Sequence, residues 1–286
     1  MTKENETSEK AGIKPDYGQN RTLAQLASQF FPPIEFNIES LTLFEPKNDI
    51  QTLSTYLNSV YWKLGLADYH VSKALSAIPS VIPNDEPNKG SAASAIHMAL
   101  MRGHHDEEVD RMEIAMLETE AHGIAAAQAL DSVPDILSQA LYLALRLDLK
   151  KPMLEGLRTV QSVTQALEDA ALNSVSTGLK ELVNSETFEY LRAFVNTTKH
   201  RSLIDNLFHR SLVDSEDYGL TICAFRYEER SGKVKGWPSK TFKEFLEYTA
   251  VYMSAAVGAI LRTAEGLLAS FAGWPAERFW FKLEKI

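Results

Sequence analysis

Apolar side chains recur every three or four positions through residues 49–78, and this spacing constrains the fold more than any other feature of the chain. Because an α-helix makes one turn in about 3.6 residues, only a helix places such a series on one side. The stretch therefore predicts a long helix with one apolar face. The members of the series are Leu53, Tyr56, Val60, Leu64, Ala67, Val71 and Leu75.

The same kind of pattern predicts helices along most of the remaining chain. Three prolines interrupt it in residues 79–90, which we expect to form a loop. After that loop we expect helices over residues 92–101, 106–130, 135–147, 153–183 and 241–271, together with a helix that contains residues 194–213.

Residues suited to helix starts lie between several of these segments. Ser132 precedes a Val-Pro-Asp triplet with the spacing of a capping box, and proline is favoured in the first helical turn. Pro152 stands at the start of the segment over residues 153–183. Ser185 can cap the helix that leads into residues 194–213.

A different period appears between the last two helical regions. Apolar and polar residues alternate from Thr221 to Glu228, which predicts a strand, and the Ser231–Gly232 pair predicts a turn before a second short strand. We therefore expect an all-α helical bundle with a small β-hairpin insertion near residues 219–238. Residues 1–20 are polar and are expected to form a flexible tail, and residues 21–286 a single domain.

Charge and composition exclude several classes of protein. The formal net charge is −9, which argues against coating nucleic acid through bulk electrostatic attraction. The single cysteine, Cys223, excludes an internal disulfide framework. The N-terminus lacks the apolar core of a signal peptide, and the longest apolar run, residues 249–261, is too short to span a bilayer. We expect a cytoplasmic protein that is not in a membrane.

The most unusual segment is residues 194–213, because polar and basic residues stand at the centre of a predicted inner helix. On a helical wheel, Leu203 and Leu207 share a side with the polar residues Arg192, Asn196 and His200. Lys199 lies between this side and the neighbouring apolar side of the helix, and Arg201 comes directly after His200 in the chain. A partly buried group of this kind can bind an anion or a nucleotide. The alternative is structural, because buried amides and imidazoles often tie neighbouring elements together.

Two further polar residues are candidates for the same site. Glu118 and His122 are four residues apart and face the same way on the helix predicted over residues 106–130. We expect them to contact the basic group as ligand-binding or hydrogen-bonding partners. Di-metal helical bundles use a Glu-x-x-His spacing that this chain lacks, so we expect neither a metal nor a cofactor.

Residues 113–145, 193–205 and 219–233 together resemble the HEPN superfamily of helical proteins. The resemblance implies an antiparallel helical bundle that forms a homodimer. It also implies a metal-independent endoribonuclease, or an RNA-associated partner of an antitoxin, in toxin–antitoxin or phage-defence systems. In that family an Arg and a His in the spacing R-x4-6-H meet at the dimer interface, where the His acts as acid or base and the Arg stabilises phosphate charge.

The chain departs from this motif. His200 follows Arg192 by eight positions, and His209 follows Arg201 by eight, so each His is rotated about 80° from its Arg on a helix. Two hypotheses follow. In the first, the protein acts on or binds RNA or a nucleotide, with His200 as the catalytic acid or base, Asn196 as the orienting group, and Lys199 and Arg201 holding phosphate. In the second, it is a non-catalytic interaction or scaffold protein whose Asn/His cluster is structural.

Overall fold

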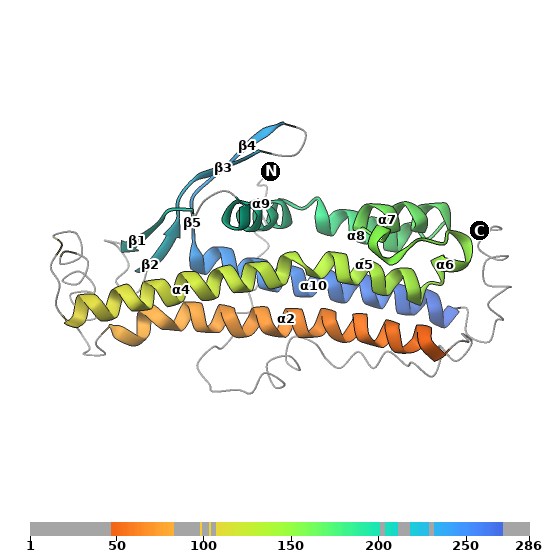
Figure 1. The fold of residues 1–286 in the computed structure, drawn as a ribbon, viewed down its shortest axis with the longest axis horizontal. Coiled ribbons are helices and arrows are strands. Elements are labelled where there is room, and N and C mark those ends of the chain that lie inside the picture. Colours follow the sequence, from red (N-terminus) through yellow and green to blue (C-terminus); the bar gives the residue numbers. More distant parts are fainter. Residues whose placement is uncertain are drawn as a thin grey trace, which may run out of the picture.

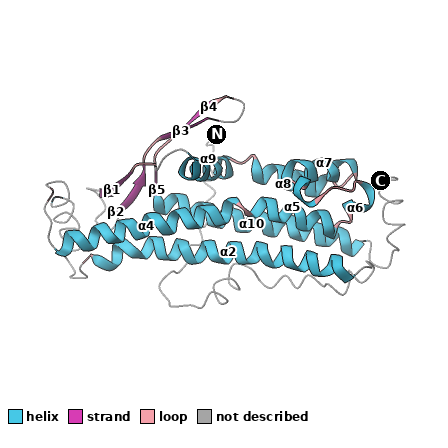
Figure 2. Cartoon of the chain, in the orientation of Figure 1, coloured by secondary structure: helices cyan, strands magenta, loops and turns pink. Residues whose placement is uncertain are grey.

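The computed structural model describes residues 47–82, 98, 103, 107–200, 204–210, 218–228 and 232–270, and this part of the chain is mostly helical (Figures 1 and 2). The predicted tail over residues 1–20 lies outside the described residues, as does the predicted helix over residues 92–101 except for Met98. The helices are α2 (Lys47–Val81), α4 (Glu107–Asp131), α5 (Val133–Ala144), α6 (Leu147–Lys150), α7 (Val160–Asp169), α8 (Asn173–Val183), α9 (Glu186–His200) and α10 (Phe242–Ser270), with a 3₁₀ turn at Glu155–Leu157.

Three long rods form the frame of the molecule. Helices α2 and α4 run antiparallel side by side, α5 continues in the direction of α4, and α10 lies along them (Figure 1). The seam between α2 and α4 is tied by the Thr119 hydroxyl, which donates to the Ala74 carbonyl oxygen at 3.1 Å. The apolar series predicted for residues 49–78 faces this core, with Val60 and Ala67 fully buried.

Helix α2 ends later than the prolines suggested. Pro79 lies inside its last turn, and α2 continues to Val81. A proline costs a helix the hydrogen bond that its missing N–H would have donated. Near the C-terminus of a helix, the only group that loses its hydrogen-bond donor in this way is one carbonyl group close to the end. The loop that we predicted to begin at residue 79 was therefore placed too early.

The segment predicted as one helix over residues 153–183 is instead divided into the 3₁₀ turn, α7 and α8. Helix α7 begins at Val160 and is capped by Thr159, whose side chain accepts a hydrogen bond from the Ser162 amide. It ends where Ala171 adopts a left-handed backbone with φ of 59°, a conformation that stops a right-handed helix. Periodicity alone did not register either break, because the apolar pattern continues across both.

The two predicted serine caps have different outcomes. Ser185 accepts a hydrogen bond from the Phe188 amide at 3.1 Å, as expected for a cap of α9. Ser132 makes no capping bond and has a helical backbone, and its hydroxyl donates to the Ala129 carbonyl oxygen. The prediction at Ser132 was wrong because α4 passes almost directly into α5, with Pro134 in the first turn of α5 as expected.

The β insertion is larger than the predicted hairpin. Strands β3 (Phe225–Glu228) and β4 (Val234–Trp237) form an antiparallel pair, which confirms a hairpin within residues 219–238. A second sheet has the order β1-β2-β5, built from β1 (Asn206–Arg210), β2 (Tyr218–Ile222) and β5 (Lys240–Thr241). The strand predicted over Thr221–Glu228 is interrupted after β2, where the Cys223 amide donates to the Asp205 carbonyl oxygen.

Strand β1 corrects the prediction that a helix covers residues 194–213. Helix α9 ends at His200, and Asn206–Arg210 pairs in register with Tyr218–Ile222. The backbone hydrogen bonds of this pairing satisfy donors and acceptors that a helix would have satisfied internally. The helical wheel that grouped Leu207 with Asn196 therefore does not apply, and the Leu207 side chain is 62 % exposed.

Candidate functional site

Helix α9 carries most of the predicted site and lies between α4 and the β3–β4 hairpin. It starts with Glu186 and Glu189 in its first turn, where acidic side chains stabilise the positive end of the helix dipole. Leu191, Phe194 and Val195 are buried and form its apolar side. In Figure 1 the helix is viewed nearly along its axis, whereas α2, α4 and α10 run across the picture.

Asn196 is joined to the hairpin. Its Nδ2 atom donates a hydrogen bond to the Tyr227 Oη atom at 3.4 Å. Lys235, which lies directly opposite Tyr227 in the hairpin, donates from Nζ to the Glu189 Oε2 atom at 2.6 Å. Glu189 and Asn196 are seven residues apart, two turns along one side of α9. These two contacts therefore hold one face of the hairpin against one side of the helix.

An aromatic cluster reinforces the same junction. Phe225 and Trp237 are opposite one another in the hairpin, and each ring packs edge-on against Tyr190 with centroids 5.5 Å apart. Phe194 adds a further edge contact with Phe225. Burial raises the pKa of the Tyr190 hydroxyl far above its usual value, so this phenol stays neutral and donates to the Pro238 carbonyl oxygen.

Arg192 is joined to α4 rather than to an open cavity. Its Nε atom lies 3.6 Å from the Asp131 Oδ1 atom, and its guanidinium stacks on the Phe188 ring at 4.7 Å. Burial raises the pKa of Asp131, while the charges of Arg192 and Lys199 oppose that rise. The buried Oδ1 atom makes no hydrogen bond within the described residues, so the ion pair is electrostatic and compensates only part of the desolvation.

The remaining residues predicted for this site are only partly placed. Lys199 is exposed and close enough to Asp131 to affect its ionisation. Arg201 and the side chain of His200 lie outside the described residues. Of the residues predicted on α9, Arg192 thus forms an ion pair with α4, Lys199 is exposed, and Asn196 bonds to the hairpin.

His122 is joined to a residue that the sequence did not single out. Its Nδ1 atom lies 2.8 Å from the Nδ1 atom of His70, across the seam between α2 and α4. Glu118, one turn before His122, is exposed. His70 stands beside Val71 and Ala67 of the apolar series, and that position next to a predicted interface was the only signal for it. Among the described residues, no group of three or more His, Cys, Asp or Glu could hold a metal ion.

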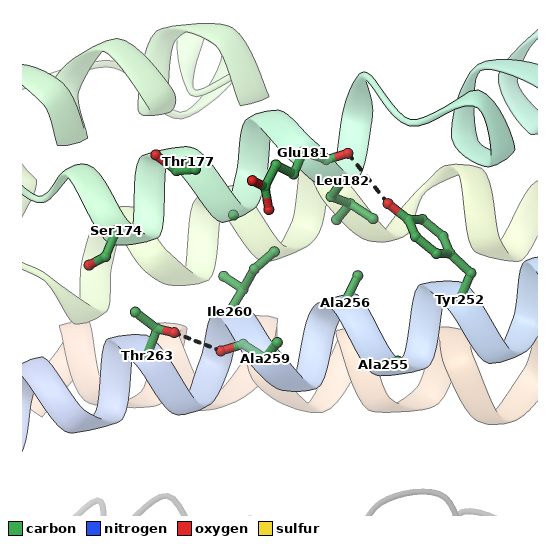
Figure 3. Close-up of a pocket in the computed structure, with 11 residues that line it drawn as sticks. Ser174, Thr177, Glu181, Leu182, Tyr252, Ala255, Ala256, Ala259, Ile260 and Thr263 are labelled. Carbon is green, nitrogen blue, oxygen red and sulfur yellow. Dashed lines mark hydrogen bonds between the residues drawn. The ribbon is translucent and has the colours of Figure 1, made fainter. Parts of the chain in front are cut away.

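A groove between α8 and α10 has a volume of about 370 Å³ and lies apart from all the residues that we predicted (Figure 3). Small side chains dominate its walls, and Glu181 is the one charged side chain among them. The Tyr252 hydroxyl closes one end by donating to the Glu181 carbonyl oxygen at 3.4 Å. The lining residues are Ser174, Thr177, Gly178, Glu181, Leu182, Tyr252, Ala255, Ala256, Ala259, Ile260 and Thr263.

Gly178 sets how closely the two helices approach. A Cβ atom at this position would lie 3.0 Å from the Ile260 Cγ1 atom, tighter than nearly all real contacts. The helices therefore touch at Gly178 and Ile260, and the groove lies over this contact. No pattern in the sequence predicts this groove, because small and mixed-polarity residues form no chemical motif.

Helix α10 is more apolar than its burial explains. By length and composition it could cross a membrane, and only one third of its most apolar stretch is buried in the described structure. It nevertheless packs against α8, α2 and α4. Tyr248, Val251, Ala255 and Ala259 follow one another at spacings of three or four residues and are all exposed. This row, which we call the α10 stripe, continues one wall of the groove.

The chain matches no protein-family model, no curated protein and no solved structure. The HEPN resemblance therefore stays a prediction, and the function has to be argued from the geometry.

Proposed function

We propose that the protein is a non-catalytic helical interaction protein that binds a partner protein along the groove between α8 and α10. One observation carries the proposal: the groove continues into the α10 stripe, an uncovered apolar row on a helix of which only a third of the most apolar stretch is buried. A contiguous row of exposed apolar side chains on a helix can mark an interaction site.

The partner that fits is an amphipathic helix. Alanine, glycine, serine and threonine in the walls let another helix backbone approach closely, and the α10 stripe repeats once per turn. Apolar residues at positions i, i+4 and i+7 of the partner would contact the groove. The negative charge of Glu181 favours a lysine or arginine at the facing position of the partner helix.

The contacts of α9 support the absence of catalysis. Asn196 bonds to Tyr227, and Arg192 is paired with Asp131, so both groups hold neighbouring elements together. A catalytic amide or guanidinium must instead be directed at a substrate. Asn196 and Arg192 thus have a structural explanation that requires no ligand.

Site-specific photo-crosslinking tests the proposal. A benzoylphenylalanine at Ala255, in the groove, should give a discrete adduct in cells. The same residue at Ala121, an equally exposed alanine on α4, should not. The cross-linked peptide should be an amphipathic helix with a basic residue, and Ala259→Trp should abolish the adduct by filling the groove. Absence of an adduct at Ala255, or co-sedimentation of the purified chain with phospholipid vesicles through α10, would contradict the proposal.

A second candidate function is binding or cleavage of RNA or a nucleotide at α9, in a HEPN-like homodimer that acts in toxin–antitoxin or phage defence. One observation favours it. Arg192, whose side chain is 44 % exposed, and the exposed Lys199 are seven residues apart and therefore lie on the same side of α9. In this case His200 is the acid or base and Asn196 orients it. Lys199→Glu should then abolish RNA binding, and His200→Ala should abolish cleavage without lowering the melting temperature.

A further inference from the structure

His70 of α2 and His122 of α4 face one another nitrogen to nitrogen. Their Nδ1 atoms are 2.8 Å apart, and their ring centroids are 5.1 Å apart with the ring planes inclined by 34°. The centroid separation exceeds the nitrogen separation by about two ring radii, so the two Nδ1 atoms lie close to the line that joins the rings. This is the geometry of one N–H···N hydrogen bond, in which one ring donates and the other accepts.

We infer that His70 and His122 share a single proton that holds α2 against α4, and that this contact is lost when both imidazoles become protonated. The pair thus makes the α2–α4 seam sensitive to acid. This inference is independent of the partner proposed for the α8–α10 groove.

The proton balance defines two steps. With both rings neutral, the donor carries its proton on Nδ1 and has a free lone pair on Nε2. A first added proton binds that Nε2 atom and forms an imidazolium whose Nδ1–H can still donate to the neutral ring. A second proton can bind only the Nδ1 atom of the acceptor, and this removes the lone pair that accepts the bond. Two cations then face one another, and the rings must separate.

The surroundings offer little compensation for a second charge. The Tyr69 ring packs edge-on against both imidazoles, with centroids 5.2 Å from His70 and 6.4 Å from His122. Lys73, which lies over Tyr69, adds a positive charge nearby. Asp68 is two residues before His70 and therefore projects from nearly the opposite side of α2.

On α4, the exposed Glu118 lies one turn before His122 on the same side, and Glu120, two residues before His122, projects from nearly the opposite side. Helix α10 contacts both α2 and α4, and on α2 the charge of Glu265 acts on Tyr61. No carboxylate is among the groups whose charge shifts the pKa of His70.

The pKa of His70 is shifted in the direction that this inference requires. Burial, and then the charge of His122, lower the pKa of His70 below its ordinary value of 6.5. The unfolded chain therefore binds this proton more readily than the folded one. The stability that the neutral His70 ring contributes is complete above pH 6.5 and is lost progressively as the pH falls below it.

Urea unfolding between pH 5 and 7.5 tests the inference. Below pH 6.5 the unfolding equilibrium constant of the wild type should rise by up to about tenfold per pH unit more than that of His70→Asn. Asparagine keeps a donor near the Nδ1 position but cannot be protonated. The matched control is His209→Asn, because the Nδ1 atom of His209 is bonded to an uncharged group, the Thr221 hydroxyl, at 2.9 Å.

A second measurement does not depend on how the variants fold. In ¹⁵N-histidine spectra of the wild type above pH 7, one of the two rings should carry its proton on Nδ1 and the other on Nε2. Two Nε2–H rings, or equal pH dependence in wild type and His70→Asn, would overturn the inference. So would a rise in melting temperature with Zn²⁺ that His70→Asn abolishes, because the pair would then be a metal site.

Discussion

Among the glycines in the described part of the chain, Gly123 is the one where an added methyl group should cost most stability. It lies on α4 against the ring of Phe242, the first residue of α10. A Cβ atom there would be 2.3 Å from the Phe242 Cε1 atom and 2.8 Å from Cδ1, whereas ordinary contact begins near 3.4 Å. Phe242 is 1 % exposed, so its ring has no free space to enter. Overpacking of this kind costs roughly 1–3 kcal/mol.

The chain contains a matched control for the backbone effect of Gly123→Ala. Gly65 lies within α2, and a Cβ atom there would meet nothing within 4 Å. Alanine is favoured over glycine inside a helix by about 0.8–1.0 kcal/mol, so Gly65→Ala should raise the free energy of unfolding by about that amount. At Gly123 the same gain offsets part of the cost of the overlap, and we expect a net loss of up to about 2 kcal/mol.

Urea unfolding of both variants, in the wild-type and Phe242→Leu backgrounds, measures the effect. The cost of Gly123→Ala should largely disappear in the Phe242→Leu background because the smaller leucine side chain removes the overlap, whereas the gain from Gly65→Ala should be the same in both backgrounds. If Gly123→Ala stabilises the protein as Gly65→Ala does, the close approach of α4 and α10 is not real. An equal cost in both backgrounds would show that the Phe242 ring is not its cause.

Two further predictions concern the surroundings of α9. The hydrogen bond from Asn196 to Tyr227 is long at 3.4 Å, so a double-mutant cycle of Asn196→Ala and Tyr227→Phe in urea unfolding should give a coupling of only about 0.5 kcal/mol, and a coupling near zero would remove Asn196 from the junction. Because burial raises the pKa of Asp131, the stability that its protonated form contributes is present below pH 3.8 and is lost as the pH rises through the folded pKa. Asp131→Asn should therefore be more stable than wild type at pH 7 and nearly equal to it at pH 4, and a loss of stability at pH 7 would mean that the ion pair with Arg192 outweighs desolvation.

The helices could be predicted from the sequence where one continuous side of each is buried against the rest of the bundle. The series from Leu53 to Leu75 is of this kind, and its period alone identifies α2. The ends were less certain, because they depend on local backbone conformation. Ala171 ends α7 with a left-handed φ that alanine rarely adopts, so its residue type does not predict that the helix ends there.

The strand at Asn206–Arg210 could not be predicted for a different reason. Its side chains continue the helical pattern of α9 well enough, and its strand conformation is stabilised by pairing with Tyr218–Ile222, twelve or more residues later along most of the ladder. A short stretch of sequence does not show which distant segment it will pair with. The error at β1 also misplaced Leu207, and with it the face on which the predicted site depended.

The His70–His122 contact and the α8–α10 groove escaped detection because each depends on how two helices meet. His122 was noticed for its spacing to Glu118 on the same helix, yet its contact is a residue 52 positions away on α2. Conversely, Asn196 and Arg192 attracted attention as polar residues in an apolar setting, and their described contacts join α9 to β3 and α4. In a bundle of this kind, polar residues inside the frame are needed to fix how its elements meet, so their presence is weak evidence for chemistry. The stronger evidence for function is apolar surface that no element covers, and within the described residues the α10 stripe beside its groove provides it.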